Sequence, residues 1–384
     1  MRLLHTSDWH LGRTFHGRDL LSEQESVLGW MAELVAAEQV DVVVVSGDLY
    51  DRAVPSAEAV AAGNRVLSRI RAAGAELVVI AGNHDSAPRL GAFGEFAAAG
   101  GLHLRTRISE LDTPVLFTDQ HGPVAVYGIP YLEPDPARHA LGVPELRGHN
   151  AVLTEAMNRV RTDLATRPAG TRSVVLAHAF VIGGESSASE RTIAIGGVEE
   201  VAGSVFDGVD YVALGHLHGP QRLAEHLRYS GSPIAYSFSE AAHHKSVWLV
   251  ELGPAGLARV ERRELPVPRR LSTLRGELEA LLADPTVEGR TDCYLSVTLI
   301  DQVRPLDAMR RLQERFPFAV RLDWQPVGGR TGEPLRYAKV GHGREDHLVT
   351  EDFLADCRGS EPSGAERAML AEAFAAVRRA EVST

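Results

Sequence analysis

The chain has 384 residues, of which 44% are hydrophobic and 24% are charged, a composition typical of globular proteins and a length sufficient for two or more domains. Its formal net charge of -11 argues against a protein that coats nucleic acid by itself, because that task usually leaves a basic footprint. A nuclease is not excluded, since a local basic patch, divalent metal ions or a partner subunit can hold the phosphates.

Three further features exclude other classes of protein. Every apolar run is shorter than the roughly 20 residues that a membrane span needs, so we expect no membrane attachment. The opening sequence MRLLHTSDWH has neither a long apolar core nor a small-residue cleavage site, so we expect no secretory signal. The two cysteines, Cys293 and Cys357, lie far apart in the sequence, which argues against a disulfide framework or a thiolate metal cluster. These features predict a cytoplasmic protein.

The first predicted strand, Arg2–Thr6, runs into a polar segment that contains Asp8 and His10. If the chain is still extended there, these two side chains point to the same face, as a chelating pair requires. Histidine is the commonest metal ligand among side chains, and a neighbouring carboxylate suits a divalent ion. The alternative interpretation is a capping aspartate beside a loop histidine.

A helix predicted over Glu23–Glu38 by its apolar spacing leads into a second strand. Four consecutive valines, Val42–Val45, predict a strand that is buried on both faces. The strand stops at Gly47 and Asp48. A carboxylate directly after a buried strand, with a glycine that allows a tight turn, lies where open α/β sheets build their sites. Asp48 is therefore a candidate site residue, although an aspartate there is also a common helix cap.

The same arrangement returns after the next helix, which is predicted over Ser56–Ala73. A strand over Glu76–Ile80 ends in the sequence AGNHD. Asn83 offers a neutral oxygen ligand, and His84 can serve as a ligand or as a proton donor. Asp85 is expected to cap the backbone.

Short segments from Leu104 to Pro130 predict a second layer of strands, of which Val124–Ile129 has the clearest pattern. A helix over Ala151–Ala165 then precedes a strand over Ser173–Ala177 that ends at His178. The polar, glycine-rich segment Gly183–Gly197 is expected to be an exposed loop beside the site.

The last occurrence follows a strand over Tyr211–Leu214, where His216 and His218 are again two residues apart. Two edge strands are expected to close the second layer, at Tyr229–Pro233 and Val247–Glu251. The segment His243–Lys245 between them is expected to be a solvated turn. No function is assigned to four other histidines: His103, His121, His139 and His149.

After Pro268 the pattern changes to a small α+β domain without catalytic groups. We expect domain boundaries at residues 1–267 for the catalytic domain, 268–327 for the small domain, 328–345 for a linker and 346–384 for a helical segment. Within the last segment, two short amphipathic stretches near Phe353–Leu354 and Met369–Val377 are candidates for docking on a partner. The helices and strands expected in the small domain are Ser272–Ala283, Cys293–Ile300, Pro305–Phe316 and Ala319–Trp324.

The polar residues at these strand ends form one set that is specifically metal-binding in type. In a sheet of mainly parallel strands all such ends lie on one edge, so distant parts of the chain can meet there. Two divalent ions bridged by a carboxylate would use such a set, and such a pair clamps a phosphate. The alternative interpretation is that these are five unrelated strand caps. Because the set is specifically metal-binding in type, the sequence favours a two-metal phosphoesterase. The set is Asp8, His10, Asp48, Asn83, His84, His178, His216 and His218.

The ordered motifs DWH, GDLYD, GNHD and GHLH, with His178 between the last two, resemble those of the calcineurin-like metallophosphoesterases. Four longer stretches, HTSDWHLGR, AGNHDS, ALGHLH and YSGSPIAYSF, are similar to SbcD-type nuclease subunits of bacterial SbcCD complexes. The resemblance covers nearly the whole chain. It implies an α/β fold in which a two-layered β-sandwich flanked by helices is followed by a small α+β capping domain and C-terminal partner-binding helices.

The resemblance also implies roles for individual residues. One metal ion would be held by Asp8, His10, Asp48 and His218, and a second by Asp48, Asn83, His178 and His216, with Asp48 as the bridge. His84 would stabilise the transition state or protonate the leaving oxygen. Related nucleases of other kingdoms have a second histidine three positions after the bridging aspartate. Here that position is Asp51, which receives no catalytic role.

A site of imidazoles and carboxylates suits Mn²⁺ or Fe²⁺ better than Ca²⁺, and we expect two Mn²⁺ ions. The resemblance implies a double-strand 3′–5′ exonuclease and a single-strand or hairpin endonuclease for DNA repair, recombination and replication. It also implies an SbcC-type ATPase partner and a homodimer within a heterotetramer. The chain has no GxxxxGK[ST] pattern, so ATP dependence would come from that partner. The alternatives are a phosphatase or cyclic-nucleotide phosphodiesterase on the same scaffold, and a non-catalytic scaffold that binds DNA ends.

Overall fold

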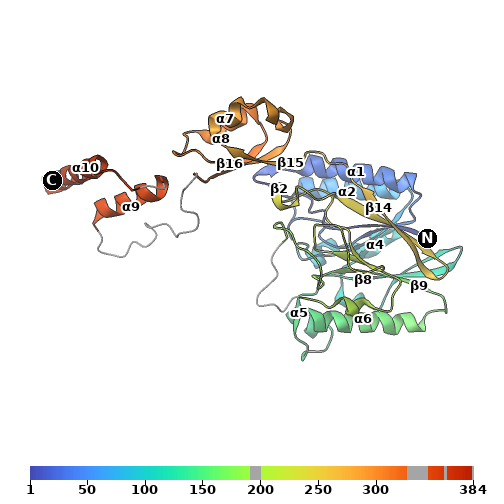
Figure 1. Cartoon of the computed structure of the whole chain (residues 1–384). Coiled ribbons are helices and arrows are strands. Elements are labelled where there is room, and N and C mark those ends of the chain that lie inside the picture. Colours follow the sequence, from blue (N-terminus) through green and yellow to red (C-terminus); the bar gives the residue numbers. More distant parts are fainter. Residues whose placement is uncertain (191–199, 327–344, 359–360, 383–384) are drawn as a thin grey trace. The chain divides into compact units, whose positions relative to one another are not determined.

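The structure is a computed structural model that describes residues 1–190, 200–326, 345–358 and 361–382 (Figure 1). It divides into two compact units, Met1–Arg269 and Arg270–Thr384. The predicted linker, 328–345, lies outside the described residues except for Glu345. The finer division of the second unit into a capping domain, a linker and a helical segment stays a prediction.

Two six-stranded sheets form the first unit, in the orders β14-β13-β1-β4-β5-β6 and β11-β12-β10-β9-β8-β7. Four neighbouring strands in each sheet are parallel: β1, β4, β5 and β6 in the first, and β8, β9, β10 and β12 in the second. The carboxyl ends of each parallel set therefore share one edge of their sheet. The strands of the first sheet are β1 (Arg2–Thr6), β4 (Val42–Val45), β5 (Glu76–Ile80), β6 (Leu102–Arg105), β13 (Ser246–Gly253) and β14 (Gly256–Glu264). Those of the second are β7 (Val115–Asp119), β8 (Gly122–Ile129), β9 (Arg172–His178), β10 (Tyr211–Gly215), β11 (Gln221–Arg222) and β12 (Leu227–Tyr229), and a separate small hairpin joins β2 (Thr14–Phe15) to β3 (Arg18–Asp19).

The two sheets pack face to face around a shared apolar core. Val42 and Val44 of the first sheet belong to the same buried cluster as Val174 of the second. Side chains alternate between the two faces of a strand, so Val43 and Val45 point away from this core, and they too are fully buried. The run of four valines thus forms a strand that is covered on both faces, as predicted.

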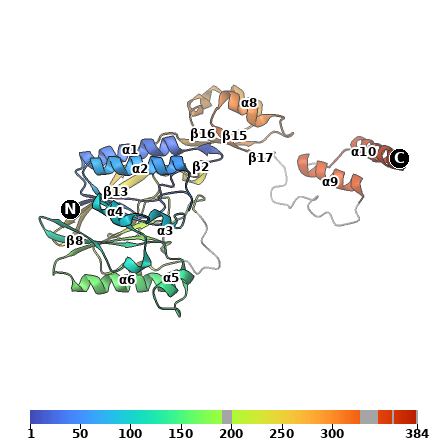
Figure 2. The same ribbon diagram turned by 180° about the vertical axis from the view of Figure 1, so that it is seen from behind.

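Helices cover both outer faces of the sandwich. Helices α1 (Leu21–Ala37) and α2 (Ala57–Ala72) lie on one side, and α6 (Gly148–Thr166) lies on the opposite side in both views (Figures 1 and 2). The predicted two-layered sandwich flanked by helices is confirmed. Shorter helical segments are α3 (Ala87–Leu90), α4 (Gly94–Ala99), α5 (Pro134–Ala140), η1 (Ile108–Glu110), η2 (Gly203–Phe206) and η3 (Phe238–Glu240).

Three strands differ from the prediction. The edge strand expected at Tyr229–Pro233 is β12, which ends at Tyr229 and lies between β11 and β10 in the second sheet. β6 overlaps the stretch expected in the second layer but pairs with β5 in the first sheet. β13 was expected to close an edge of the second layer, whereas it lies inside the first sheet between β1 and β14. It pairs antiparallel with both neighbours, and its turn into β14 closes a hairpin at Gly253 and Gly256. Local periodicity identifies a strand but carries no information on which strands lie beside it.

The expected solvated turn at His243–Lys245 is wrong for its last residue. His244 is exposed, whereas the Lys245 side chain is only 4% exposed. The Lys245 ammonium donates to the Glu240 carboxylate across 2.5 Å. A buried lysine needs such a partner, and the sequence pattern does not reveal it.

The second unit contains a small parallel sheet in the order β15-β16-β17. The helix predicted over Ser272–Ala283 is wrong in its first half, because Leu271–Gly276 pairs with β16 as a strand. Its second half is helix α7. Leu281 of α7 and Leu312 of α8 pack into one apolar core with the sheet. The elements are β15 (Leu271–Gly276), α7 (Leu278–Ala283), η4 (Pro285–Arg290), β16 (Tyr294–Leu299), α8 (Ala308–Arg315) and β17 (Ala319–Trp324).

Two helices end the described chain, α9 (Asp346–Arg358) and α10 (Gly364–Val382). Each contains one of the two amphipathic stretches predicted from the sequence. Arg367 of α10 forms an ion pair of 3.1 Å with Glu351 of α9. Among the described residues, no helix combines the length and the apolar character needed to cross a membrane.

Candidate metal centre

All eight predicted site residues lie at or just beyond the carboxyl ends of parallel strands in the first unit. The sequence analysis expected them at one edge of a single sheet, which is wrong, because the strands that carry them belong to both sheets of the sandwich. Asp8 and His10 follow β1, Asp48 follows β4, Asn83 and His84 follow β5, His178 ends β9, and His216 and His218 follow β10.

The loops after β1 and β4 are tied together by their backbones. The Asp8 amide donates to the Gly47 carbonyl across 3.0 Å, and the His10 amide donates to the Asp48 carbonyl across 2.9 Å. Asp8 and His10 have φ angles of 54° and 45°, so the chain is not extended beyond Thr6. The two side chains converge because of this left-handed turn, and the reasoning from an extended strand was wrong.

Left-handed backbone recurs at other predicted site residues. Asp48 has a φ of 52° and His216 a φ of 109°. Such conformations are costly for residues with a side chain and concentrate at functional sites.

Two glycines allow the strand-end loops to pack closely. A Cβ on Gly82 would lie 2.2 Å from Asp48 Oδ1, and a Cβ on Gly215 would lie 1.9 Å from the Ser46 carbonyl oxygen. Both distances are far inside van der Waals contact. The glycines of the GNHD and GHLH motifs are thus required for the loops to approach one another.

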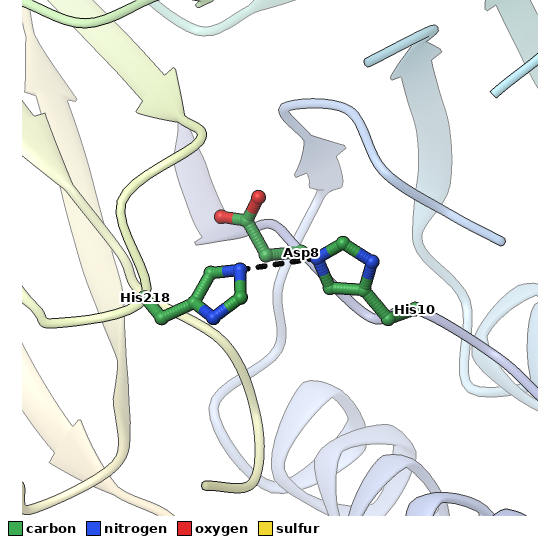
Figure 3. A group of neighbouring side chains, drawn as sticks. All are labelled: Asp8, His10 and His218. Carbon is green, nitrogen blue, oxygen red and sulfur yellow. Dashed lines mark hydrogen bonds between the residues drawn. The ribbon is translucent and has the colours of Figure 1, made fainter. Parts of the chain in front are cut away.

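Asp8, His10 and His218 bring potential ligand atoms together within 4.8 Å of one another (Figure 3). The Nε2 atoms of the two histidines are 3.1 Å apart. The Asp8 carboxylate is oriented by the His216 amide, which donates to Oδ1 across 3.0 Å, and by the Ser7 hydroxyl, which donates to Oδ2 across 2.5 Å.

Asp48 lies between the two halves of the cluster. Its Oδ2 is 3.6 Å from His10 Nε2 and 3.5 Å from His178 Nε2. On the far side, His178 Nε2 is 2.9 Å from Asn83 Oδ1. Further triplets of potential ligand atoms join His10 and Asp48 to His84, and Asp8 and Asp48 to His178. The triplets overlap, so the geometry alone does not separate the two predicted ligand sets.

His216 lies beside the cluster. Its ring centroid is 5.3 Å from that of His178. Among the described residues, its ring belongs to none of the three triplets. Asp85 accepts hydrogen bonds from the backbone amides of Leu49, Tyr50 and Gly82, which confirms its predicted role as a backbone cap.

The His84 ring packs edge-on against the His10 ring, with centroids 4.6 Å apart. Its backbone amide donates to Asp48 Oδ1 across 2.8 Å. Its Nδ1 donates to the Asp51 carbonyl oxygen across 2.8 Å, which directs Nε2 away from that contact. With 9% of its surface exposed, His84 is the most accessible of the five predicted histidines.

The electrostatics of the cluster fit bound cations. His178 Nδ1 donates to the Ser46 carbonyl across 2.8 Å, so in a neutral ring Nε2 presents a lone pair. Burial lowers the pKa of His178 to about 4, which keeps that ring neutral at pH 7. The lone pair therefore faces oxygen atoms of Asn83 and Asp48, an arrangement that a divalent cation would stabilise.

The carboxylates of the cluster also fit a bound cation. Burial and the nearby Asp48 charge raise the pKa of Asp8 well above its usual value. Two buried carboxylates repel each other unless a positive charge lies between them.

Several residues that support the site were missed by the sequence analysis. Gln24 Nε2 donates to the Trp9 and His10 carbonyls, and the Tyr236 hydroxyl also donates to the Trp9 carbonyl. Ser189, Glu190 and Glu240 surround His218. The signals that could have pointed to them were the polar, glycine-rich segment expected beside the site, which contains Ser189 and Glu190, and the YSGSPIAYSF stretch, which contains Tyr236.

The part of that segment that the structure describes, 183–190, does lie beside the site, as predicted. It is not uniformly exposed, because Ser189 is buried. Residues 191–197 of the predicted loop lie outside the described residues.

Two family models match the chain. Residues 1–220 match the model described as "Calcineurin-like phosphoesterase". Residues 267–346 match the model SbcD_C, described as "Type 5 capsule protein repressor C-terminal domain". Among solved structures, the chain is similar to a dimetal phosphatase from Danio rerio, with 15% identity, a TM-score of 0.36, and coverage of 68% of this chain and 98% of that one.

Proposed function

The chain belongs to the calcineurin-like phosphoesterase family, and from that premise we propose that it is the metal-dependent nuclease subunit of an SbcCD-type complex. The family supports a metal-dependent hydrolase. The match of residues 267–346 to the SbcD_C model supports the more specific proposal, because it adds a second, independent domain to the metallophosphoesterase domain.

The observation that carries the catalytic proposal is the position of Asp48. One of its carboxylate oxygens lies between His10 and His178, within 3.6 Å of both. We assign one divalent ion to Asp8, His10, Asp48 and His218, and a second to Asp48, Asn83, His178 and His216. We propose that both are Mn²⁺. Two such ions supply Lewis acidity toward a phosphate and lower the pKa of water.

His84 is proposed as the catalytic residue of the chain. The Asp51 carbonyl fixes its ring by accepting from Nδ1, so Nε2 is the atom that would act on the substrate. A proton held there would be transferred to the leaving oxygen or would stabilise the charge that develops on the phosphate. Asp51 acts in this proposal through its backbone oxygen.

The proposed substrates are double-strand DNA ends and hairpins, cleaved by 3′–5′ exonuclease and endonuclease activity in DNA repair, recombination and replication in the cytoplasm. Helices α9 and α10 expose apolar side chains such as Phe353 and Met369. Exposed apolar residues on amphipathic helices suit docking on a protein partner, and we propose an SbcC-type ATPase for that role. A homodimer within a heterotetramer completes the proposal.

The test compares substrates under identical conditions. Purified protein with Mn²⁺ is incubated with hairpin DNA, linear duplex and p-nitrophenyl phosphate esters, with and without the ATPase partner. We expect cleavage of DNA by the wild type and none by Asp48→Ala. Cleavage of the small esters alone would replace the proposal by a phosphatase or phosphodiesterase. No cleavage of any substrate, even with the partner, would favour a non-catalytic scaffold.

A further inference from the structure

His218 is held differently from His178 and His84. His178 and His84 each donate from Nδ1 to a backbone carbonyl. In contrast, His218 Nδ1 lies 2.6 Å from the Ser189 hydroxyl, and that hydroxyl contacts Glu240 Oε1 in turn. A buried chain of side chains, from imidazole through hydroxyl to carboxylate, therefore ends on a predicted metal ligand.

The charges around this chain set the direction of its hydrogen bonds. Glu240 is 1% exposed, and its other oxygen, Oε2, accepts from the Lys245 ammonium across 2.5 Å. The two side chains form a buried ion pair in which the charges compensate each other. An ionised carboxylate only accepts hydrogen bonds. The Ser189 hydroxyl must therefore donate to Glu240, and its oxygen accepts from His218 Nδ1.

This direction fixes which nitrogen of His218 is available to a metal ion. With the hydrogen on Nδ1, the neutral ring presents its lone pair from Nε2. That atom is the one that lies 3.1 Å from His10 Nε2 beside Asp8 (Figure 3). The network thus selects both the tautomer and the orientation that a ligand at this position requires.

The backbone of His218 is clamped by the same group of residues. Glu190 Oε1 accepts from the His218 amide across 2.8 Å, and the Lys245 ammonium donates to the His218 carbonyl across 2.8 Å. Arg13 donates to the Ser189 carbonyl across 2.6 Å and so holds the serine in place. Separate hydrogen bonds therefore hold the ring and the backbone of His218.

We propose that Ser189 and Glu240 are positioning residues that set the tautomer and the orientation of His218 for a divalent cation, and that the ion pair with Lys245 holds Glu240 in place. The inference rests on the metal site assigned under the proposed function, but not on which phosphoester is cleaved. Neither Ser189 nor Glu240 is itself assigned as a metal ligand.

Ser189→Ala is the sharpest test because it removes the hydroxyl and leaves the Glu240–Lys245 ion pair intact. Ser187→Ala is its matched control. The Ser187 hydroxyl lies 2.9 Å from the Ser189 hydroxyl and also contacts Glu240, at 3.3 Å, and Glu190, at 2.7 Å. The control therefore removes a hydroxyl from the same network and leaves the contact between Ser189 and His218 in place. The readout is a titration of the metal-free full chain with Mn²⁺, in which free Mn²⁺ is measured by electron paramagnetic resonance.

We expect the wild type and Ser187→Ala to bind two Mn²⁺ ions. In Ser189→Ala the affinity for one ion should fall about 10-fold to 100-fold, the usual effect of removing a hydrogen-bond partner of a ligating histidine. Ser189→Thr, which keeps the hydroxyl, should recover most of that affinity. Melting curves in EDTA establish that each variant folds. If the alanine variant does not fold, Ser189→Cys is used, because a thiol of similar size is a weak hydrogen-bond partner.

The inference is overturned if folded Ser189→Ala binds both ions as the wild type does, or if Ser187→Ala loses as much affinity. A wild type that binds no Mn²⁺ would overturn it together with the metal assignment. A wild type that binds two ions but leaves DNA intact would refute only the proposed function. The two proposals therefore fail in distinguishable ways.

Discussion

Asp48→Asn should abolish binding of at least one metal ion and yet make the metal-free protein more stable. The substitution keeps the size of the side chain and an oxygen that can accept from the His84 amide, which now donates to Asp48 Oδ1 across 2.8 Å. It removes the negative charge at Oδ2, which lies between His10 and His178. When metal is bound, the Asp48 carboxylate is a ligand. When no metal is bound, it is a buried negative charge close to other carboxylates, which destabilises the folded state.

The size of the gain follows from the neighbouring carboxylates. Burial, together with the Asp48 charge, raises the pKa of Asp85 from 3.8 to about 7. That rise corresponds to about 4 kcal/mol of lost stability once Asp85 is ionised. Burial is the larger cause, so the Asp48 charge accounts for less than half of this energy, and removing it should return about 1–2 kcal/mol. At roughly 2–4 °C per kcal/mol for a domain of this size, the melting temperature should rise by several degrees.

The assay is a pair of thermal melts at pH 8, one in EDTA and one in excess Mn²⁺. The wild type should gain about 2.7 kcal/mol when free Mn²⁺ is 100 times its dissociation constant, whereas Asp48→Asn should gain much less. The exposed Asp112 provides a control, because Asp112→Asn should change neither melt. A lower melting temperature for Asp48→Asn in EDTA, or a Mn²⁺ shift equal to that of the wild type, would refute this reasoning.

Three further predictions follow from the same geometry. His84→Ala should keep both metal ions by mass analysis and lose about 10²-fold to 10⁴-fold in DNA cleavage, the usual contribution of a general acid; equal metal loss in His84→Ala and Asp48→Ala would defeat the role given to His84. Gly215→Ala should cost at least about 2 kcal/mol in urea unfolding, because its Cβ would lie 1.9 Å from the Ser46 carbonyl, and an unchanged midpoint would contradict that contact. In EDTA, the wild type should lose stability relative to Asp85→Asn as the pH rises from about 4 to about 7. The folded pKa of Asp85 is raised to about 7, so in this range the folded state holds a proton that the unfolded state has released. A difference in stability that does not depend on pH would exclude this raised pKa.

Elements with a strong local pattern could be predicted from the sequence. The strands Val42–Val45, Glu76–Ile80 and Ala319–Trp324 have the bounds expected for them. The sequence also predicted that the strand-end residues would come together, but the single-sheet argument explains this only in part. Asp48 and His178, 130 residues apart in the sequence, follow β4 and β9, which belong to different sheets. They meet because the two sheets pack face to face, which the sequence pattern does not reveal.

Features that depend on tertiary partners could not be predicted. The segment Leu271–Gly276 has apolar residues at a spacing that suits a helix, but its pairing with β16 decides in favour of a strand. Likewise, Glu240 and Lys245 are ordinary surface residue types in the sequence. They are buried only because each neutralises the other beside His218, and no local pattern encodes that distance.

The sequence motifs located the residues of the centre but not its backbone conformation. Eight described non-glycine residues have a positive φ, and four of them are predicted metal ligands: Asp8, His10, Asp48 and His216. Each such conformation costs on the order of 1–3 kcal/mol, and hydrogen bonds between neighbouring loops compensate for it, such as the contact of the His216 amide with the Asp8 carboxylate.

These hydrogen bonds join groups of the chain itself, and the sandwich that carries the loops has its own apolar core. We therefore expect metal binding to add to the stability of this unit without being required for its fold, in contrast to small zinc domains that fold only around their metal. A cooperative melt of the wild type in EDTA would agree with this expectation, and an unfolded chain in EDTA would contradict it.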